Sequence, residues 1–272
     1  MTRAKAYAKI NLALVVGPTR ADGTHEVVTV LQRIDLHDGL ELASAPTLVV
    51  EGFDGDTLVR GALEALAAAT GAEPEWRARI EKRIPVAAGL GGGSSDAAAA
   101  LVLANARLEN PLPVEELHRI AAGLGSDVPF FLRSGAQLAT GSGTELVALD
   151  LPTSYTVLLV LPYGHAKEST AAVYRAFDAR RGAAGFGERG AALREALARI
   201  HEPADLDRLP LNDLATSPLA VRLRELGAFR ADVSGAGPAV YGLFDTLAEA
   251  ERAARGLHDA GRTWVAHPVD RP

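Results

Sequence analysis

Residues 85–96 read PVAAGLGGGSSD, and this stretch decides more about the protein than any other part of the chain. Four of the five residues from Gly89 to Gly93 are glycine, which adopts positive φ freely and lets the backbone approach a ligand closely. Helix formers follow and predict a helix from Ser94, whose first N–H groups would favour an anion. The pattern predicts a phosphate-binding loop; the alternative is a plain turn before a capped helix.

Two common phosphate-binding motifs do not fit this loop. A Walker A loop ends in Gly-Lys-Ser/Thr, and no lysine follows Gly93 here. A dinucleotide fingerprint that starts at Gly89 and Gly91 needs a glycine where this chain has Ser94. The hydroxyls of Ser94 and Ser95 instead add donors beside the expected phosphate oxygens. The loop is therefore predicted to be an anion-binding loop of another class.

The composition excludes several classes of protein. The chain has 272 residues, 48% hydrophobic and 23% charged, as in a globular protein. Its net charge of −6, without a concentrated basic patch, argues against nucleic-acid binding. The lack of cysteine excludes disulfides and thiolate chemistry, and the seven histidines form no zincin-type pair. Lys5, Lys9 and Asn11 interrupt the first apolar run, and no stretch reaches the roughly 20 apolar residues of a membrane span. We expect a soluble, cytoplasmic protein.

Strand and helix patterns are mixed along the chain and predict an α+β protein. Strands are predicted over 10–12, 27–36, 40–42, 48–50, 77–84, 155–161, 229–233, 240–244 and 263–267, with a hairpin over 137–149. Helices are predicted over 58–69, from residue 94, and over 114–123, 169–177, 190–200, 218–226 and 247–257. The segment 180–189, rich in Gly and Arg, is predicted to be a mobile loop. A polar stretch at 150–154 predicts two domains, residues 1–150 and 151–272.

The loop and four other segments together resemble the GHMP kinases, the family of galactokinase, homoserine kinase and mevalonate kinase. The other segments are AKINL at Ala8–Leu12, RADGTH at Arg20–His25, GSDVPFF at Gly125–Phe131 and SGAGP at Ser234–Pro238. The long form of the loop, PxxxGLGGGSSDAA, is most similar to the branch of the family that acts on a methylerythritol linked to cytidine diphosphate. The matches are collinear and span most of the chain.

The resemblance implies a fold and a reaction. The fold would be the two-domain α+β GHMP kinase fold, with an N-terminal domain like domain 2 of ribosomal protein S5 and a ferredoxin-like C-terminal sandwich. The reaction would transfer a phosphoryl group from ATP, with Mg²⁺, to the 2-hydroxyl of the methylerythritol unit, in the non-mevalonate route to isoprenoid precursors. The expected partner is this small molecule, without nucleic acid or membrane, and the protein would be a monomer or a weak homodimer.

The resemblance also implies roles for individual residues. Asp127 would be the catalytic base and Lys9 its electrostatic partner, because phosphoryl transfer needs a proton acceptor and charge stabilisation. ATP would bind to Pro85, Val86, Ala87, Ala88, Gly89, Leu90, Gly91, Gly92, Gly93, Ser94 and Ser95, with Thr57 and Lys82. The acceptor would bind to Asn11, His25, Thr170 and Tyr174.

Taken alone, the residues at the reacting centre have ordinary explanations. Asp127 would be a turn residue before Pro129, because Ser-Asp-x-Pro favours turns. Lys9 would be an exposed lysine on a strand. Asn11 shares a strand face with Lys9 and is equally compatible with a polar edge-strand residue. It is the occurrence of Lys9 and Asp127 together with the loop that favours the catalytic interpretation.

The acceptor side depends on weaker residues. His25 alone would be a solvated loop histidine, Tyr174 has spacing that also suits the core, and Ser234–Pro238 is compatible with a tight turn. Two positions depart from the family pattern: Thr24 stands where an aromatic is usual, and Thr57 where an asparagine is usual. Both departures concern the contacts to the cytosine and adenine bases. They do not touch the phosphate loop or the catalytic pair.

Two rival hypotheses remain at this stage. One is a GHMP kinase for homoserine, mevalonate or a sugar, against which the segments Arg20–His25 and Gly125–Phe131 argue. The other is a nucleotide-binding module without catalysis, against which the presence of both Lys9 and Asp127 argues.

Overall fold

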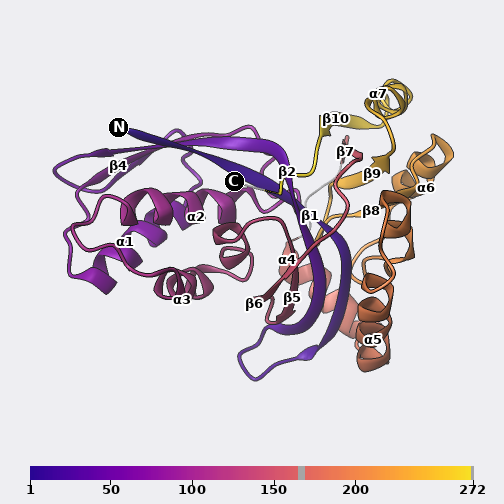
Figure 1. The fold of residues 1–272 in the computed structure, drawn as a ribbon, viewed down its shortest axis with the longest axis horizontal. Coiled ribbons are helices and arrows are strands. Elements are labelled where there is room, and N and C mark those ends of the chain that lie inside the picture. Colours follow the sequence, from indigo (N-terminus) through magenta and orange to yellow (C-terminus); the bar gives the residue numbers. More distant parts are fainter. Residues whose placement is uncertain (165–168, 271–272) are drawn as a thin grey trace. The chain divides into compact units, whose positions relative to one another are not determined.

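The computed structural model describes residues 1–164 and 169–270, which form two compact units (Figure 1). Two long strands, β1 (Thr2–Thr19) and β2 (His25–Ser44), pair with each other and contribute residues to both units. The first unit consists of Met1–Ala8, Leu36–Val86 and Gly91–Ser134. The second unit consists of Lys9–Asp35, Ala87–Leu90 and Gly135–Pro272.

The first unit is a sheet with helices packed on one face (Figure 1). Strand β4 (Trp76–Glu81) pairs antiparallel with the second half of β2 and parallel with β3 (Val49–Glu51). Successive side chains of β4 point to opposite faces, so its apolar residues are buried and its charged residues are exposed. The buried side chains pack against α1 (Leu58–Thr70), α2 (Gly92–Asn105) and α3 (Val114–Leu124). The short helix η1 (Pro129–Leu132) follows α3.

The second unit contains an antiparallel sheet with strand order β10-β7-β9-β8. Apolar side chains of this sheet pack with those of α6 and α7, while Arg230, Asp232 and Tyr241 are buried outside that apolar cluster. The first half of β2 pairs with β5, which forms a hairpin with β6. The strands are β5 (Ala136–Gly141), β6 (Glu145–Leu149), β7 (Thr156–Pro162), β8 (Arg230–Val233), β9 (Val240–Phe244) and β10 (Gly261–Ala266). The helices are α4 (Thr170–Ala179), α5 (Phe186–Leu197), η2 (Pro203–Arg208), α6 (Pro218–Glu225) and α7 (Leu247–Arg255).

The α+β prediction is confirmed, and so is the hairpin predicted over 137–149. Several predictions about element boundaries are wrong. Strand β1 extends far beyond 10–12, β4 ends at Glu81 and not at Ile84, and the helix predicted over 190–200 is Phe186–Leu197. The strands predicted over 27–36 and 40–42 are one strand, because β2 pairs with β5 in its first half and with β4 in its second. The helix predicted from Ser94 begins at Gly92, because Gly91 caps it in the left-handed conformation, without a side-chain cap.

The segment 180–189 was predicted to be a mobile loop, and this prediction is wrong for its second half. Helix α5 begins at Phe186 and includes Arg189, whose Nη2 donates to the carbonyls of Val16 and Gly182 at 2.9 Å each. These bonds tie the start of α5 to strand β1. The division into domains at residue 150 stays a prediction.

Candidate active site

The glycine-rich segment is a loop in which every second residue from Ala87 to Gly91 has positive φ. The φ angles are 60° at Ala87, 83° at Gly89 and 71° at Gly91. Alternation of left-handed residues turns backbone N–H groups toward one side and forms the concave nests that bind anions. The loop ends at α2, where Ser95 N donates to the Gly91 carbonyl at 2.9 Å. The N–H groups of the first turn before Ser95 have no acceptor within the helix, which favours a phosphate there.

Gly89 lies against the second glycine motif, Ser234–Pro238. A Cβ added to Gly89 would stand 2.1 Å from the Ser234 carbonyl oxygen, so no other residue fits this approach. The Ser234 hydroxyl donates to the Gly89 carbonyl at 3.0 Å, and Ala239 N donates to the Ala88 carbonyl at 3.1 Å. The second motif is therefore more than a tight turn, because it holds the phosphate loop in place.

Lys9 and Asn11 form a buried polar group on β1. The Lys9 ammonium donates to Asn11 Oδ1 at 2.7 Å, and Asn11 Nδ2 donates to Thr29 Oγ1 at 2.8 Å. The two side chains are only 3% and 4% exposed, so Lys9 is not an ordinary surface lysine. A Cβ on Gly235 would lie 3.5 Å from both Lys9 Nζ and Asn11 Oδ1. This group and the second glycine motif therefore lie next to each other within the second unit.

Backbone bonds connect the same group to the phosphate loop. Lys9 N donates to the Leu90 carbonyl at 3.0 Å, and Asn11 N donates to Ser234 Oγ at 3.4 Å. Ser234 is fully buried, and its hydroxyl thus contacts both β1 and the loop. The second unit therefore brings together Lys9, Asn11 and the residues around Gly89; their shared role in one site stays a prediction.

In the first unit, Lys82 bridges two buried carboxylates. Its ammonium pairs with Asp38 on β2 and, at 2.8 Å, with Asp96 on α2. Asp38 also accepts the backbone N–H groups of Arg83 at 2.5 Å and Ile84 at 2.8 Å. Lys82–Ile84 leads into the phosphate loop and Asp96 follows it, so this triad fixes both ends of the loop segment. Lys82 was predicted to bind ATP, and Asp38 was not singled out from the sequence.

Protonation of Asp96 should make stability depend on pH. Burial, together with the Asp38 carboxylate, raises the pKa of Asp96 to about 7 despite the opposing charge of Lys82. Between pH 5 and pH 7 the folded protein keeps a proton on Asp96 that the unfolded chain, with a carboxyl pKa of about 4, has released. The free energy of unfolding should therefore decrease as the pH rises through this range.

The matched variants are Asp96→Asn and, as a control at an exposed position, Asp54→Asn. From pH 5 to pH 8, this group should lower the melting temperature of the wild type and of the control by roughly 5–10 °C. The two pH units up to its pKa correspond to about 2.7 kcal/mol, and 1 kcal/mol shifts the melting temperature by about 2–4 °C. Asp96→Asn should remove that part of the slope. Equal slopes in all three proteins would contradict the assignment.

Asp127 lies in the turn between α3 and η1, in the first unit. Val128 N donates to the Gly125 carbonyl at 3.1 Å and closes this turn, and Pro129 then starts η1. The Asp127 side chain is half-buried. Thr57 is exposed at the N-terminus of α1, where the cap is provided instead by Asp56, whose carboxylate accepts Val59 N and Arg60 N.

His25 and Tyr174 meet in the second unit, although they are far apart in sequence. Their ring centroids are 4.6 Å apart with an interplanar angle of 37°, and Phe177 meets His25 edge-on at 6.1 Å. The His25 Nε2 atom pairs with Asp178 at 2.8 Å. Tyr174 also packs against a buried apolar cluster, and Ala236 of the second glycine motif packs against the same cluster. Thr170 is exposed at the first turn of the same helix, four residues before Tyr174.

Comparisons with known proteins agree with this geometry. The family of GHMP kinase N-terminal domains matches residues 57–135, and the family of GHMP kinase C-terminal domains matches residues 188–263. A 4-diphosphocytidyl-2-C-methyl-D-erythritol kinase from Desulfitobacterium hafniense is 37% identical over 98% of this chain and 95% of its own. The chain belongs to the GHMP kinase family. The kinase of the same name from Pelotomaculum thermopropionicum is 41% identical to this GHMP kinase over 92% of each chain.

Solved structures agree on the fold of this GHMP kinase. A 4-(cytidine 5′-diphospho)-2C-methyl-D-erythritol kinase matches it with a TM-score of 0.78 and 33% identity, over 98% of this chain and 99% of the other. A mevalonate kinase reaches the same TM-score at 15% identity, which supports a shared fold alone. The predicted two-domain α+β GHMP kinase fold is thereby confirmed.

Sequence reasoning missed several residues of this kinase that hold the predicted ones. They are Thr29 beneath Asn11, Asp178 beside His25, the Ser234 hydroxyl, and the carboxylates of Asp38 and Asp96. Asp96 lies within α2 and is 1% exposed. For Asp178 one signal was present, since it stands four residues after Tyr174 and therefore on the same helix face.

Proposed function

We propose that this kinase transfers the γ-phosphoryl group of ATP to the 2-hydroxyl of 4-diphosphocytidyl-2-C-methyl-D-erythritol, in the non-mevalonate pathway to isoprenoid precursors. The observation that carries the proposal is the near full-length identity of 34–41% to relatives that bear this kinase's name. The buried Lys9–Asn11 group beside the phosphate loop supports it, because phosphoryl transfer depends on fixed charges close to the phosphates.

The acceptor oxygen would attack the γ-phosphorus atom. The bond between that phosphorus and the oxygen bridging the β- and γ-phosphates would break, and ADP would leave. Asp127 would take the proton of the 2-hydroxyl. The Lys9 ammonium, oriented by its bond to Asn11 Oδ1, would stabilise the negative charge on the transferred group. Asn11, in turn held by Thr29, would contact the erythritol part of the acceptor.

ATP would lie with its phosphates against the loop Pro85–Ser95 and the first turn of α2. The Lys82 ammonium, which forms ion pairs with Asp38 and Asp96, would be part of the ATP-binding site there. When bound with ATP, Mg²⁺ neutralises phosphate charge, and it keeps most of its ligands as water and phosphate oxygens. In the described part of the chain, no three His, Asp or Glu side chains lie close enough to hold an ion by themselves.

The cytosine would bind at His25 and Tyr174. Tyr174 offers a ring face for stacking, and His25, paired with Asp178, offers a polar edge. The usual residue at position 24 is aromatic and could stack on the base, but Thr24 has no ring. The backbone N–H of Thr24 donates to Asp22 at 2.9 Å. The stacking contribution would therefore come mainly from Tyr174. Thr170, one helical turn away, would contact the same ligand.

Tyr174→Ala tests the acceptor's identity. Loss of one base stack is worth ~1–3 kcal/mol, so the KM for the diphosphocytidyl acceptor should rise roughly 5- to 150-fold. The KM for ATP should change by less than about twofold, because the proposed stack is on the acceptor's cytosine and not on ATP. Tyr163→Ala, at a residue that is 57% exposed in the same unit, is the matched control and should leave both constants unchanged. An unchanged acceptor KM in Tyr174→Ala would refute this placement of the cytosine.

In the described residues, no helix is long and apolar enough to cross a membrane. A cytoplasmic location, and a monomer or weak homodimer, remain part of the proposal.

A further inference from the structure

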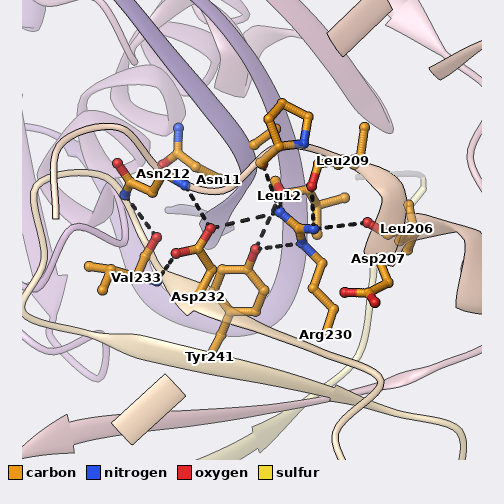
Figure 2. Close-up of polar contacts among 12 residues, drawn as sticks. Asn11, Leu12, Leu206, Asp207, Leu209, Asn212, Arg230, Asp232, Val233 and Tyr241 are labelled. Carbon is orange, nitrogen blue, oxygen red and sulfur yellow. Dashed lines mark hydrogen bonds and ion pairs between the residues drawn. The ribbon is translucent and has the colours of Figure 1, made fainter. Parts of the chain in front are cut away.

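Arg230 on β8 is fully buried, and all five of its N–H donors have acceptors (Figure 2). Nε donates to the Tyr241 hydroxyl at 3.3 Å. The two other nitrogens donate to four backbone carbonyls, those of Leu206 at 3.0 Å, Leu209 at 2.8 Å, Leu12 at 2.6 Å and Pro210 at 2.9 Å. A lysine has only three donors and no planar fork, so it could not make this set of bonds.

The charge of Arg230 is balanced within the same cluster. Asp232 lies 3.7 Å away and accepts the N–H groups of Asn212 and Val233 at 2.8 Å each. Burial raises the pKa of Asp232 above its usual value, and burial also raises that of Tyr241 to about 12. Burial of such a pair is costly, and well-packed apolar residues would often stabilise a fold as well or better. Folding alone therefore does not explain an arginine at this position.

The bonds of Arg230 lead to the candidate active site. Leu12 follows Asn11 on β1, and its carbonyl is held by Arg230 Nη2. The carbonyls of Leu206, Leu209 and Pro210 lie in the segment that leads to Asn212. The Asn212 side chain then donates to the Val233 carbonyl at 2.9 Å and to the Gly235 carbonyl at 2.7 Å. One guanidinium thus connects the strand of Lys9 and Asn11 with the second glycine motif.

We propose that Arg230 is a positioning residue for phosphoryl transfer. By holding the Leu12 carbonyl, it fixes the backbone of β1 where Lys9 and Asn11 project, and through Asn212 it fixes Gly235 beside them. This inference rests on the proposed roles of Lys9 and Asn11. A misplacement of about 1 Å at a reacting centre can cost roughly 100-fold in rate, so a residue that touches no substrate can control turnover.

The test uses Arg230→Gln, Tyr241→Phe and the control Arg222→Gln. Arg222 is also an arginine of the second unit that donates to a backbone carbonyl, that of Gly256, but its side chain is 40% exposed and pairs with Asp259 rather than with a residue of this cluster. We expect kcat to fall roughly 10- to 100-fold in Arg230→Gln and severalfold in Tyr241→Phe. The affinity for an ATP analogue should stay within about threefold. The control should keep the wild-type kcat.

A second measurement separates positioning from a purely structural role and does not need activity. The chain has four lysines, so carbon NMR of lysine-labelled protein can follow the Lys9 side chain. The Lys9 signal should shift in Arg230→Gln and Tyr241→Phe and stay in place in Arg222→Gln. A lower melting temperature with an unchanged kcat per folded molecule and an unmoved Lys9 signal would overturn the proposal. If Arg230→Gln fails to fold, the proposal is tested with Tyr241→Phe, by its kcat per folded molecule and its Lys9 signal. If the wild type does not phosphorylate the diphosphocytidyl acceptor, the proposed function is wrong. The Lys9 signal then tests by itself whether Arg230 positions Lys9.

Discussion

Asp127→Asn should lower kcat by about 10²–10⁴-fold, the usual contribution of a positioned general base. Asparagine keeps the size of the side chain and can hydrogen-bond, but it cannot take the proton of the acceptor hydroxyl. The turn that carries residue 127 is closed by the backbone bond from Val128 to Gly125, which the substitution does not remove. The affinity for an ATP analogue should therefore stay within a few-fold of the wild type.

Steady-state turnover with the diphosphocytidyl acceptor and calorimetry with an ATP analogue check this expectation. Asp54→Asn, at an exposed aspartate of the same unit, is the matched control and should have wild-type kinetics. If Asp127→Asn keeps near-normal turnover, Asp127 is not the base.

Gly89→Ala should have the second largest effect, although it adds a single methyl group. The added Cβ would lie 2.1 Å from the Ser234 carbonyl oxygen, which is far inside van der Waals contact, and the φ of 83° is strained for any residue with a Cβ. Either the phosphate loop or the second glycine motif has to move. A shift of about 1 Å at this point should weaken ATP binding or slow turnover by roughly 100-fold.

The control for this variant is Gly123→Ala in α3. No heavy atom lies within 4 Å of a Cβ there, and alanine is the better helix former by up to about 1 kcal/mol. Gly123→Ala should therefore keep full activity and gain slightly in thermal stability. Nucleotide titration and melting curves distinguish the two glycines. A fully active Gly89→Ala protein with wild-type ATP affinity would show that the contact between loop and second motif does not matter.

The parts of the site that the sequence predicted are those with strong local signals. Glycine concentration marks the phosphate loop, because few other functions require so many unhindered residues in a row. The i, i+2 spacing of Lys9 and Asn11 places both on one strand face, and the structure brings them within 2.7 Å. The resemblance assigned His25 and Tyr174 to the same ligand, but their ring contact was not predicted, since they are 149 positions apart and no local pattern connects them.

The parts that were not predicted depend on distant partners. Arg230 reaches the carbonyl of Leu12, 218 positions away, and Lys82 reaches Asp38, 44 positions away. A strand pattern at 229–233 shows where Arg230 and Asp232 point but not which carbonyls face them. The start of α2 was also misplaced: the helix formers predicted a start at Ser94, whereas the left-handed backbone conformation of Gly91 lets the helix begin at Gly92.

The most direct test of the proposed function is a reaction of the purified protein with ATP, Mg²⁺ and 4-diphosphocytidyl-2-C-methyl-D-erythritol, followed by phosphorus NMR. Homoserine and mevalonate serve as competing acceptors in parallel reactions. We predict one new phosphomonoester on the 2-hydroxyl of the diphosphocytidyl acceptor, with one ADP formed for each acceptor consumed. An unconsumed diphosphocytidyl acceptor, with phosphorylation of homoserine or mevalonate in its place, would contradict the assignment.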